Sequence, residues 1–279
     1  MDAKVRIVTD STAYMPANTL EKYPFIDIVP LTVNFSDIDI VDWTKNNEIF
    51  VENLKKSKNT PTTSKPSPQQ FIDVFKPAVE EGQEVVCINI SANLSGTMES
   101  ALAAAREVDK EKIHVIDSKL TAGPLEFLVE EAAELAAQGK TAEEIVDRVK
   151  SSINRTQIIF SPATLEYLKK GGRIGGAQAF IGTIMNIKPI LHINDDGRVD
   201  ALDKVRTAKK AYKRMIDEVP ADAEKVEVCH LMAREEAEKF REQIKEKVSV
   251  SDIEIVELGP VISVHAGPGV IGVIFRSKG

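Results

Sequence analysis

Two short segments of the chain combine hydroxyl side chains with features that suit an anion. Thr63 lies in residues 60–68, a segment that three prolines restrict to extended conformations. Ser95 and Gly96 stand where an expected strand passes into an alanine-rich expected helix. Backbone N–H groups at such a junction attract anions, and Gly96 lets a ligand approach the backbone closely. The alternatives are a linker or helix cap for the first segment and a plain N-cap for the second.

Two later segments add a guanidinium group and an imidazole. Arg173 is centred in the run Gly171–Gly176, and glycines around one arginine suit a clamp for a carboxylate or a phosphate. His265 stands among apolar residues between two Gly/Pro turns, where it could donate to an anion. The competing interpretations are a flexible interdomain turn and a core histidine. The remaining histidines are interpreted as structural: His114, His192 and His230.

Strand and helix patterns alternate along the first half of the chain. Expected strands begin near Val5, Ile26, Val85 and Ile113, and helical patterns follow the later ones. Apolar strands that alternate with helices indicate an α/β fold whose parallel sheet has helices on both faces. Residues 36–60 are polar and weakly periodic, which predicts a flap or an insertion.

The second half is less regular. The turn at residues 195–198 between two apolar runs predicts a hairpin, and helical patterns follow over 206–218 and 233–247. These elements indicate a mixed sheet with helices mainly on one face. We place the domain boundary near residue 155, which gives an N-terminal domain (1–155) and a C-terminal domain (156–279) with the ligand at their interface.

Composition limits the function classes. The net charge of -7 argues against nucleic-acid binding, and no run of 18 apolar residues predicts a membrane span. Met1 leads directly into a strand-like stretch without a signal-peptide pattern. Cys87 and Cys229 lie in apolar runs, so we expect buried, reduced thiols in a cytoplasmic protein that uses no metal or cofactor. No P-loop or GxSxG motif is present.

Taken in order, these segments resemble the DegV family of bacterial fatty-acid-binding proteins. The resemblance runs the length of the chain and rests on Asp10–Thr12, Thr63–Ser67, Leu94–Ala101, Leu165–Ile174 and Gly259–Gly269. The chain departs from the family pattern at Tyr14, at Lys65 and over residues 36–48, where the family's Gly/Tyr pattern is missing.

The resemblance implies a DegV-like two-domain fold with one long-chain fatty acid bound between the domains. It assigns the fatty acid carboxylate to Thr63, Ser95 and His265, with Gly96 and Arg173 as neighbours, and it assigns no catalytic residue. It also implies a separate fatty acid kinase catalytic subunit, which converts the presented carboxylate into an acyl-phosphate for phospholipid synthesis. The protein would then be a carrier and not an enzyme, and transient contact with a membrane stays open.

The physical chemistry is consistent with such a ligand. Burial of roughly 14 methylene groups contributes on the order of 10 kcal/mol before entropy costs, and three donors offset the desolvation of a carboxylate. Apolar residues after the glycine run are the predicted wall of the acyl slot, although each would equally suit an ordinary core: Ala179, Phe180, Ile181, Ile184, Met185 and Ile187.

Other functions stay open at this point. A hydrolase acting on a small acyl or phosphate ester would use Ser95 and His265, but no third group that would orient the histidine is evident. A lipid-sensing regulator is the other alternative. One basic stretch would dock an acidic kinase surface or simply form a solvated helix face: Lys204, Arg206, Lys209, Lys210, Lys213 and Arg214.

Overall fold

The N-terminal half forms a parallel sheet covered by helices on both faces. The computed structural model describes residues 3–57, 59–181 and 187–279. Its first sheet has the strand order β2-β1-β6-β7, and every pairing is parallel. The strands are β1 (Val5–Asp10), β2 (Ile26–Val29), β6 (Glu84–Asn89) and β7 (Ile113–Asp117).

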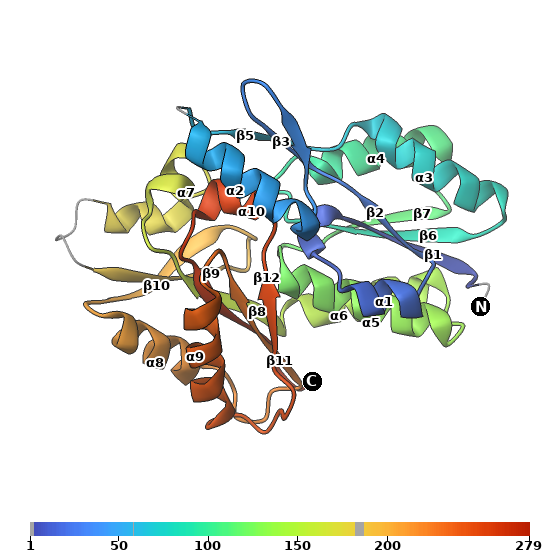
Figure 1. Ribbon diagram of the computed structural model, residues 1–279. Coiled ribbons are helices and arrows are strands. Elements are labelled where there is room, and N and C mark those ends of the chain that lie inside the picture. The colour runs from blue at the N-terminus through green and yellow to red at the C-terminus, as the bar shows by residue number, and fades with distance from the viewer. Residues whose placement is uncertain (1–2, 58, 182–186) are drawn as a thin grey trace.

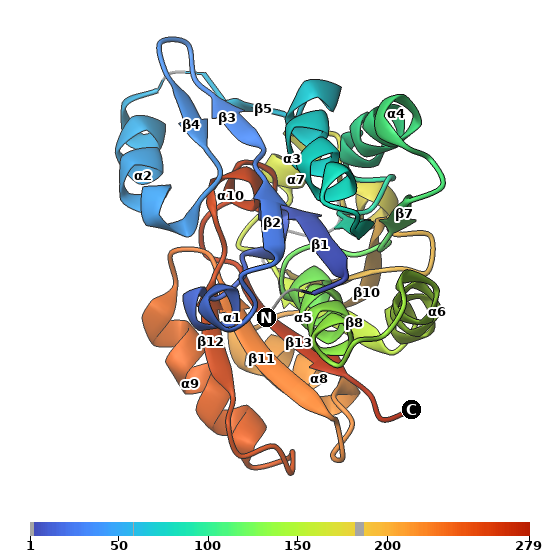
Figure 2. The same ribbon diagram turned by 90° about the vertical axis from the view of Figure 1, so that its right-hand side faces the viewer.

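The strands of this sheet are apolar on both sides because helices cover both faces (Figures 1 and 2). On one face α3 (Pro68–Glu80) and α4 (Thr97–Val108) bury residues such as Phe71 and Phe75. On the other face α5 (Gly123–Ala137) and α6 (Ala142–Ile153) bury a second core, and the short α1 (Ala17–Lys22) lies nearby. This arrangement confirms the predicted first half.

The C-terminal half forms a mixed sheet of six strands in the order β10-β9-β8-β13-β11-β12. Only the β11–β12 pairing is parallel among those that the structure describes. Helices α8 (Ala208–Glu218) and α9 (Arg234–Lys245) pack on one face, as predicted. The strands are β8 (Thr156–Ser161), β9 (Lys188–Ile193), β10 (Val199–Val205), β11 (Lys225–His230), β12 (Glu254–Glu257) and β13 (Ile271–Arg276). The predicted boundary near residue 155 falls between α6 and β8.

The other face of the C-terminal sheet is turned toward the N-terminal domain. It packs against Phe127 of α5 and against the short elements α7 (Glu166–Lys170), η3 (Gly175–Phe180) and α10 (Pro260–Ala266). The sequence did not predict α10, because its seven residues are too few to show helical periodicity between the flanking glycines. Pro260 at its first position and Gly267 after its last are typical helix boundaries.

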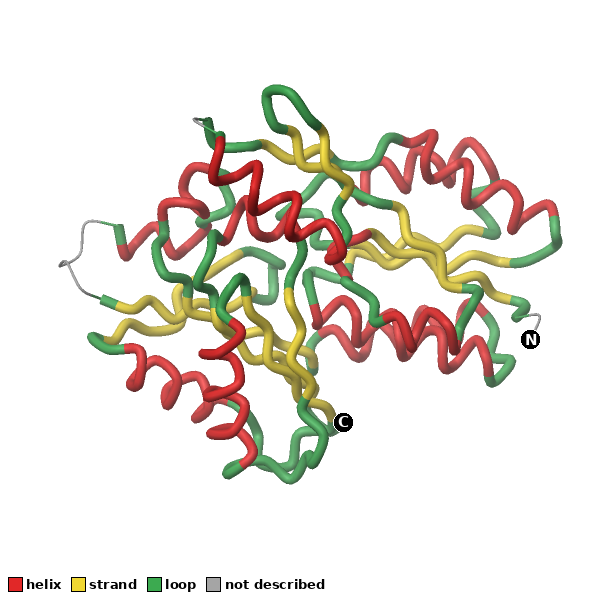
Figure 3. The backbone as a smooth tube through the Cα atoms, viewed as in Figure 1, coloured by secondary structure: helices red, strands yellow, loops and turns green. Residues whose placement is uncertain are grey.

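The described residues of the segment 36–60, which was predicted to be a flap or an insertion, are folded onto this interface. They contain β4 (Asp39–Val41), η2 (Thr44–Asn46) and α2 (Asn47–Lys56). With β3 (Thr32–Asn34) and β5 (Thr62–Ser64), β4 forms a small antiparallel sheet of order β4-β3-β5 above α10 (Figure 3). Phe50 of α2 is fully buried against Leu31, Val33 and α10. In the sequence Phe50 stands between Ile49, which is exposed, and Val51, so the apolar run does not show which of the three side chains is buried. The flap motion itself stays a prediction.

Two predictions made from composition concern the cysteines and membrane-spanning helices. Cys87 and Cys229 are buried free thiols, as predicted. Within the described part of the chain, no helix is both long and apolar enough to cross a bilayer.

Candidate functional site

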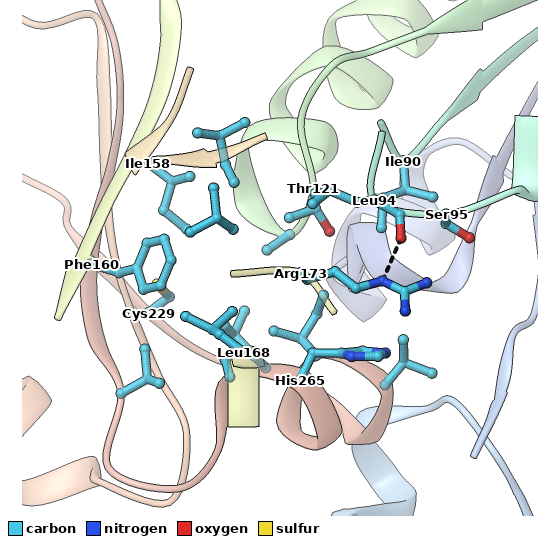
Figure 4. Close-up of a pocket in the computed structure, with 18 of the residues that line it drawn as sticks. Ile90, Leu94, Ser95, Thr121, Ile158, Phe160, Leu168, Arg173, Cys229 and His265 are labelled. Carbon is cyan, nitrogen blue, oxygen red and sulfur yellow. Dashed lines mark hydrogen bonds between the residues drawn. The ribbon is translucent and has the colours of Figure 1, made fainter. Parts of the chain in front are cut away.

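A largely apolar cavity lies between the two domains. The space within it that the centres of water molecules can reach is about 90 Å³. Sites for small molecules typically have few polar groups on an apolar lining, and this cavity has that character. Ile90, Leu94 and Thr121 line it from the N-terminal domain, whereas Ile158 and Phe160 line it from the C-terminal sheet (Figure 4).

Four of the five predicted site residues line this one cavity: Thr63, Ser95, Arg173 and His265. Figure 4 shows Ser95, Arg173 and His265 toward one side of the cavity, with Phe160 and Ile158 on the other. The fifth residue, Gly96, is not among the lining residues. A Cβ at Gly96 would lie 2.8 Å from Nζ of Lys65, so the lysine covers it. Lys65 in turn pairs with Glu99 at 2.9 Å on the exposed side.

Thr63 and His265 approach each other from opposite ends of the sequence. In β5 the side chain of Thr63 is half-buried, whereas those of its neighbours Thr62 and Ser64 are exposed, as strand alternation requires. His265 lies in the last turn of α10. Oγ1 of Thr63 and Nε2 of His265 are 2.8 Å apart, a hydrogen bond that joins the small sheet to the C-terminal domain.

Ser95 precedes α4, where the predicted strand-to-helix junction is found. The N-cap residue of α4 is Gly96, which provides no side-chain cap. Instead, Oγ of Ser95 accepts a hydrogen bond from the backbone N–H of Thr97 at 3.3 Å, and it lies 2.8 Å from Oγ1 of Thr97. Ser95 therefore makes a cap-like contact at the start of α4, and it is also one of the residues that line the cavity.

Arg173 brings a positive charge to the cavity wall. Its Nε donates to the Leu94 carbonyl at 3.0 Å, and its Nη1 donates to the Gly171 carbonyl at 2.6 Å. Among the described residues, no carboxylate forms an ion pair with it. An arginine side chain cannot lose its proton in a protein, so this partly buried charge stays without a counter-ion from the described chain.

The glycines around Arg173 serve close packing. A Cβ on Gly171 would overlap Nδ1 of His265, and a Cβ on Gly175 would overlap the Val199 carbonyl. Gly175 also adopts a positive φ of 48°, which disfavours other residues. These contacts and the two hydrogen bonds of Arg173 favour a packed segment over a flexible turn with a solvated arginine.

The environment keeps His265 neutral. Burial, followed by the charge of Arg173, lowers the pKa of His265 to about 4. Its Nδ1 is buried and has no hydrogen-bond partner among the described residues. A hydrolase would need a group there to orient the imidazole, and the Ser95 hydroxyl is hydrogen-bonded to Thr97. Two hydroxyls, a neutral imidazole and a guanidinium form a site that can hold an oxyanion.

The apolar wall differs from the predicted one. Strands of the C-terminal sheet supply much of it, because their apolar side chains on this face point into the interface: Ile158, Phe160, Ile193, Val199 and Cys229. Burial raises the pKa of the Cys229 thiol to about 12, which leaves it an unreactive apolar group.

The described residues of the predicted wall do not line this cavity. Phe180, Ile181 and Ile187 line a second pocket, and Ala179 lines neither of the two. Ile184 and Met185 lie outside the described residues. These residues follow Arg173 closely in the sequence, but the chain turns through η3, and Phe180 and Ile181 at its end line the second pocket.

Two further predictions concern a metal site and the basic stretch. Within the described ranges, no three His, Cys, Asp or Glu side chains are grouped to hold a metal ion. In the basic stretch of β10 and α8, Arg214 pairs with Asp203 and Glu218, whereas Lys209, Lys210 and Lys213 are exposed. Its docking role stays a prediction.

The structure therefore defines a two-domain α/β protein with an oxyanion-suited site at the mouth of an apolar interdomain cavity. The model of the DegV family, described as an uncharacterised protein family, matches residues 4–278. A DegV domain-containing protein of Streptomyces coelicolor is 36% identical over 285 residues, which cover 100% of both chains.

Solved structures agree with this match. A DegV family protein from Thermus thermophilus, described by its fatty acid binding, has a TM-score of 0.88 and 34% identity, and the match covers 98% of this chain and 99% of that one. DegV of Bacillus subtilis, described as a fatty acid binding protein, has a TM-score of 0.83 and 31% identity, with 98% and 99% covered. The chain belongs to the DegV family, as its motifs predicted.

Proposed function

We propose that this protein binds one long-chain fatty acid, with its carboxylate at Thr63, Ser95, Arg173 and His265 and its acyl chain in the interdomain cavity. The observation that carries the proposal is the positive charge of Arg173 on the wall of an apolar cavity, where no described carboxylate forms an ion pair with it. Apolar burial would supply most of the affinity, and the polar groups would orient the ligand. The fatty acids bound by the structural neighbours support this choice.

Lipid analysis tests the binding proposal directly. Protein purified from a bacterial host is extracted, and its lipids are identified and quantified by mass spectrometry. We expect fatty acid near one equivalent, and rebinding of one equivalent after delipidation. Absence of lipid together with no rebinding would remove the proposal.

We propose further that the bound carboxylate is presented to a separate kinase subunit, so that this chain is a carrier and performs no catalysis itself. Among the described residues no base is hydrogen-bonded to the Ser95 hydroxyl, and Nδ1 of His265 has no hydrogen-bond partner, so the site suits binding better than turnover. The partner would act in the cytoplasm, and it would leave the acyl chain in the cavity while its carboxylate reacts.

A reconstituted reaction tests presentation. Loaded protein, the kinase subunit of the source organism and magnesium ATP are mixed, and acyl-phosphate is trapped with hydroxylamine. Acyl hydroxamate should form only when both proteins are present. Reversal of charge at Lys209 and Lys213 should lower its rate without changing fatty acid affinity if the exposed face of α8 is the docking surface.

A further inference from the structure

We propose that Asp42 is a positioning residue for the head-group site, which acts by fixing the start of α10 and thereby the imidazole of His265. This inference rests on the proposed function. Asp42 follows β4 in the segment that the sequence indicated only as a flap or an insertion. Its side chain is fully buried, with 0% relative exposure, although it belongs to a residue type that is almost never buried without partners.

The partners of Asp42 come from two other parts of the chain. Oδ1 accepts from the backbone N–H of Val261 at 2.9 Å and from the hydroxyl of Tyr14 at 3.4 Å. Oδ2 accepts from the hydroxyl of Ser11 at 2.8 Å. Ser11 and Tyr14 follow β1 of the N-terminal domain, whereas Val261 lies in the first turn of α10. One carboxylate therefore joins both domains to the small sheet.

These contacts replace a local helix cap. The N-cap residue of α10, Gly259, has no side chain to satisfy the first backbone N–H groups. Asp42 accepts from one of them, and the Tyr14 hydroxyl accepts from another, that of Ile262, at 3.3 Å. A Cβ on Gly259 would overlap the Tyr14 ring, so the helix start is closely packed against this residue. Tyr14, where the chain departs from the family pattern, therefore packs against the start of α10 and hydrogen-bonds to it.

The short length of α10 transmits this constraint to the ligand site. The helix has seven residues, or about two turns, so its orientation is set largely by its first turn. His265 is four residues beyond Val261 and therefore lies on the same side of the helix. Its partner Thr63 belongs to β5, in the same three-stranded sheet as β4. Asp42 thus holds α10 against the sheet that presents Thr63.

A double-mutant cycle tests this role. Affinities for hexadecanoic acid are measured by calorimetry with delipidated wild type, D42N, H265A and the double variant. We expect D42N to weaken binding about tenfold, because an amide has one acceptor oxygen where the carboxylate has two, so that part of the hydrogen bonding to Ser11, Tyr14 and Val261 is lost. In the H265A background the same change should weaken binding less than twofold. D39N is the matched control on β4, where Asp39 is exposed, and it should bind as wild type does.

The outcomes separate this inference from the proposed function. Equal effects of D42N with and without His265 would overturn the positioning role. Failure of wild type to bind hexadecanoic acid would overturn the proposed function itself. If D42N does not fold, S11A and Y14F, which each remove one donor to Asp42, take its place in the cycle. The imidazole resonances of His265 should move in these variants even without ligand, and unchanged resonances would contradict the proposal.

Discussion

The protein buries charge at two places between its domains, and their charge balances are opposite. At the cavity, Arg173 donates to the backbone carbonyls of Leu94 and Gly171, and no described carboxylate pairs with it. The second place is the ammonium group of Lys225, which lies over the ring of Phe127. Three carboxylates surround this one ammonium group, with oxygen atoms at 3.3 Å, 2.7 Å and 3.4 Å from Nζ: Glu126, Glu130 and Glu227.

The excess positive charge at Arg173 and the excess negative charge around Lys225 can be neutralised in different ways. A surplus carboxylate can take up a proton, and burial accordingly raises the pKa of Glu227 to about 7 and that of Glu126 well above its usual value. A surplus guanidinium cannot release its proton, so only solvent or a bound anion can balance its charge. The arginine therefore supports the proposed ligand site, whereas the acidic cluster can be balanced by protons.

Removal of the arginine should have the largest effect. Arg173→Met takes away a charge-assisted partner, so the affinity for hexadecanoic acid should fall about 10- to 100-fold by calorimetry. Arg198→Met is the matched control, since Arg198 also reaches the Ser91–Ser95 loop, through Asn93, but does not line the cavity. An equal loss in both variants would mean that domain contact, and not the cavity charge, determines affinity.

Loss of one hydroxyl should have a smaller effect. Thr63→Val keeps the shape of the side chain but removes a hydrogen bond, so affinity should fall about tenfold. Thr62→Val, on the exposed side of the same strand, should leave affinity and thermal stability unchanged. Normal lipid content in purified Thr63→Val would refute the head-group assignment.

The titration of His265 provides a further test of the charge at the cavity. Without ligand its pKa is about 4, because burial and, to a smaller extent, repulsion by Arg173 disfavour the protonated form. A bound carboxylate offsets that repulsion, so the pKa should rise on binding, as followed by NMR of the imidazole. Binding would then take up protons, and affinity for the ionised acid would increase as pH falls from the bound pKa toward 4. An unchanged pKa would place the carboxylate elsewhere.

The acidic cluster should affect the ligand least. The folded-state pKa of Glu227, about 7, exceeds its usual value of 4.5, so the folded state binds the proton more tightly. Its stabilising contribution is full below 4.5 and is lost as pH rises toward 7. Glu227→Gln should therefore flatten the pH dependence of unfolding by about 1–3 kcal/mol over this window, measured by urea denaturation. Fatty acid affinity should not change, and a large change would contradict the distinction between the two sites.

The residues of the candidate site could be predicted because their signals are local in the sequence. Thr63, Ser95, Arg173 and His265 stand in short segments rich in hydroxyl, glycine or proline residues, and such segments indicate binding loops without knowledge of tertiary contacts. The apolar strands predicted both sheets for the same reason.

The cavity wall and Asp42 could not be predicted in this way. Strands buried on both faces, such as β8, show no alternation that would tell which side chains face the interface. Asp42 gains its importance from Val261, 219 positions away, and nothing near it in sequence indicates that contact.

The head-group site is tested most directly by two ligands that differ only at one end. Dissociation constants of hexadecanoic acid and hexadecan-1-ol are measured with delipidated wild-type protein at neutral pH. The acid should bind at least about tenfold more tightly, because only its carboxylate balances Arg173. Equal affinities would show that the charge at the cavity mouth plays no part in recognition.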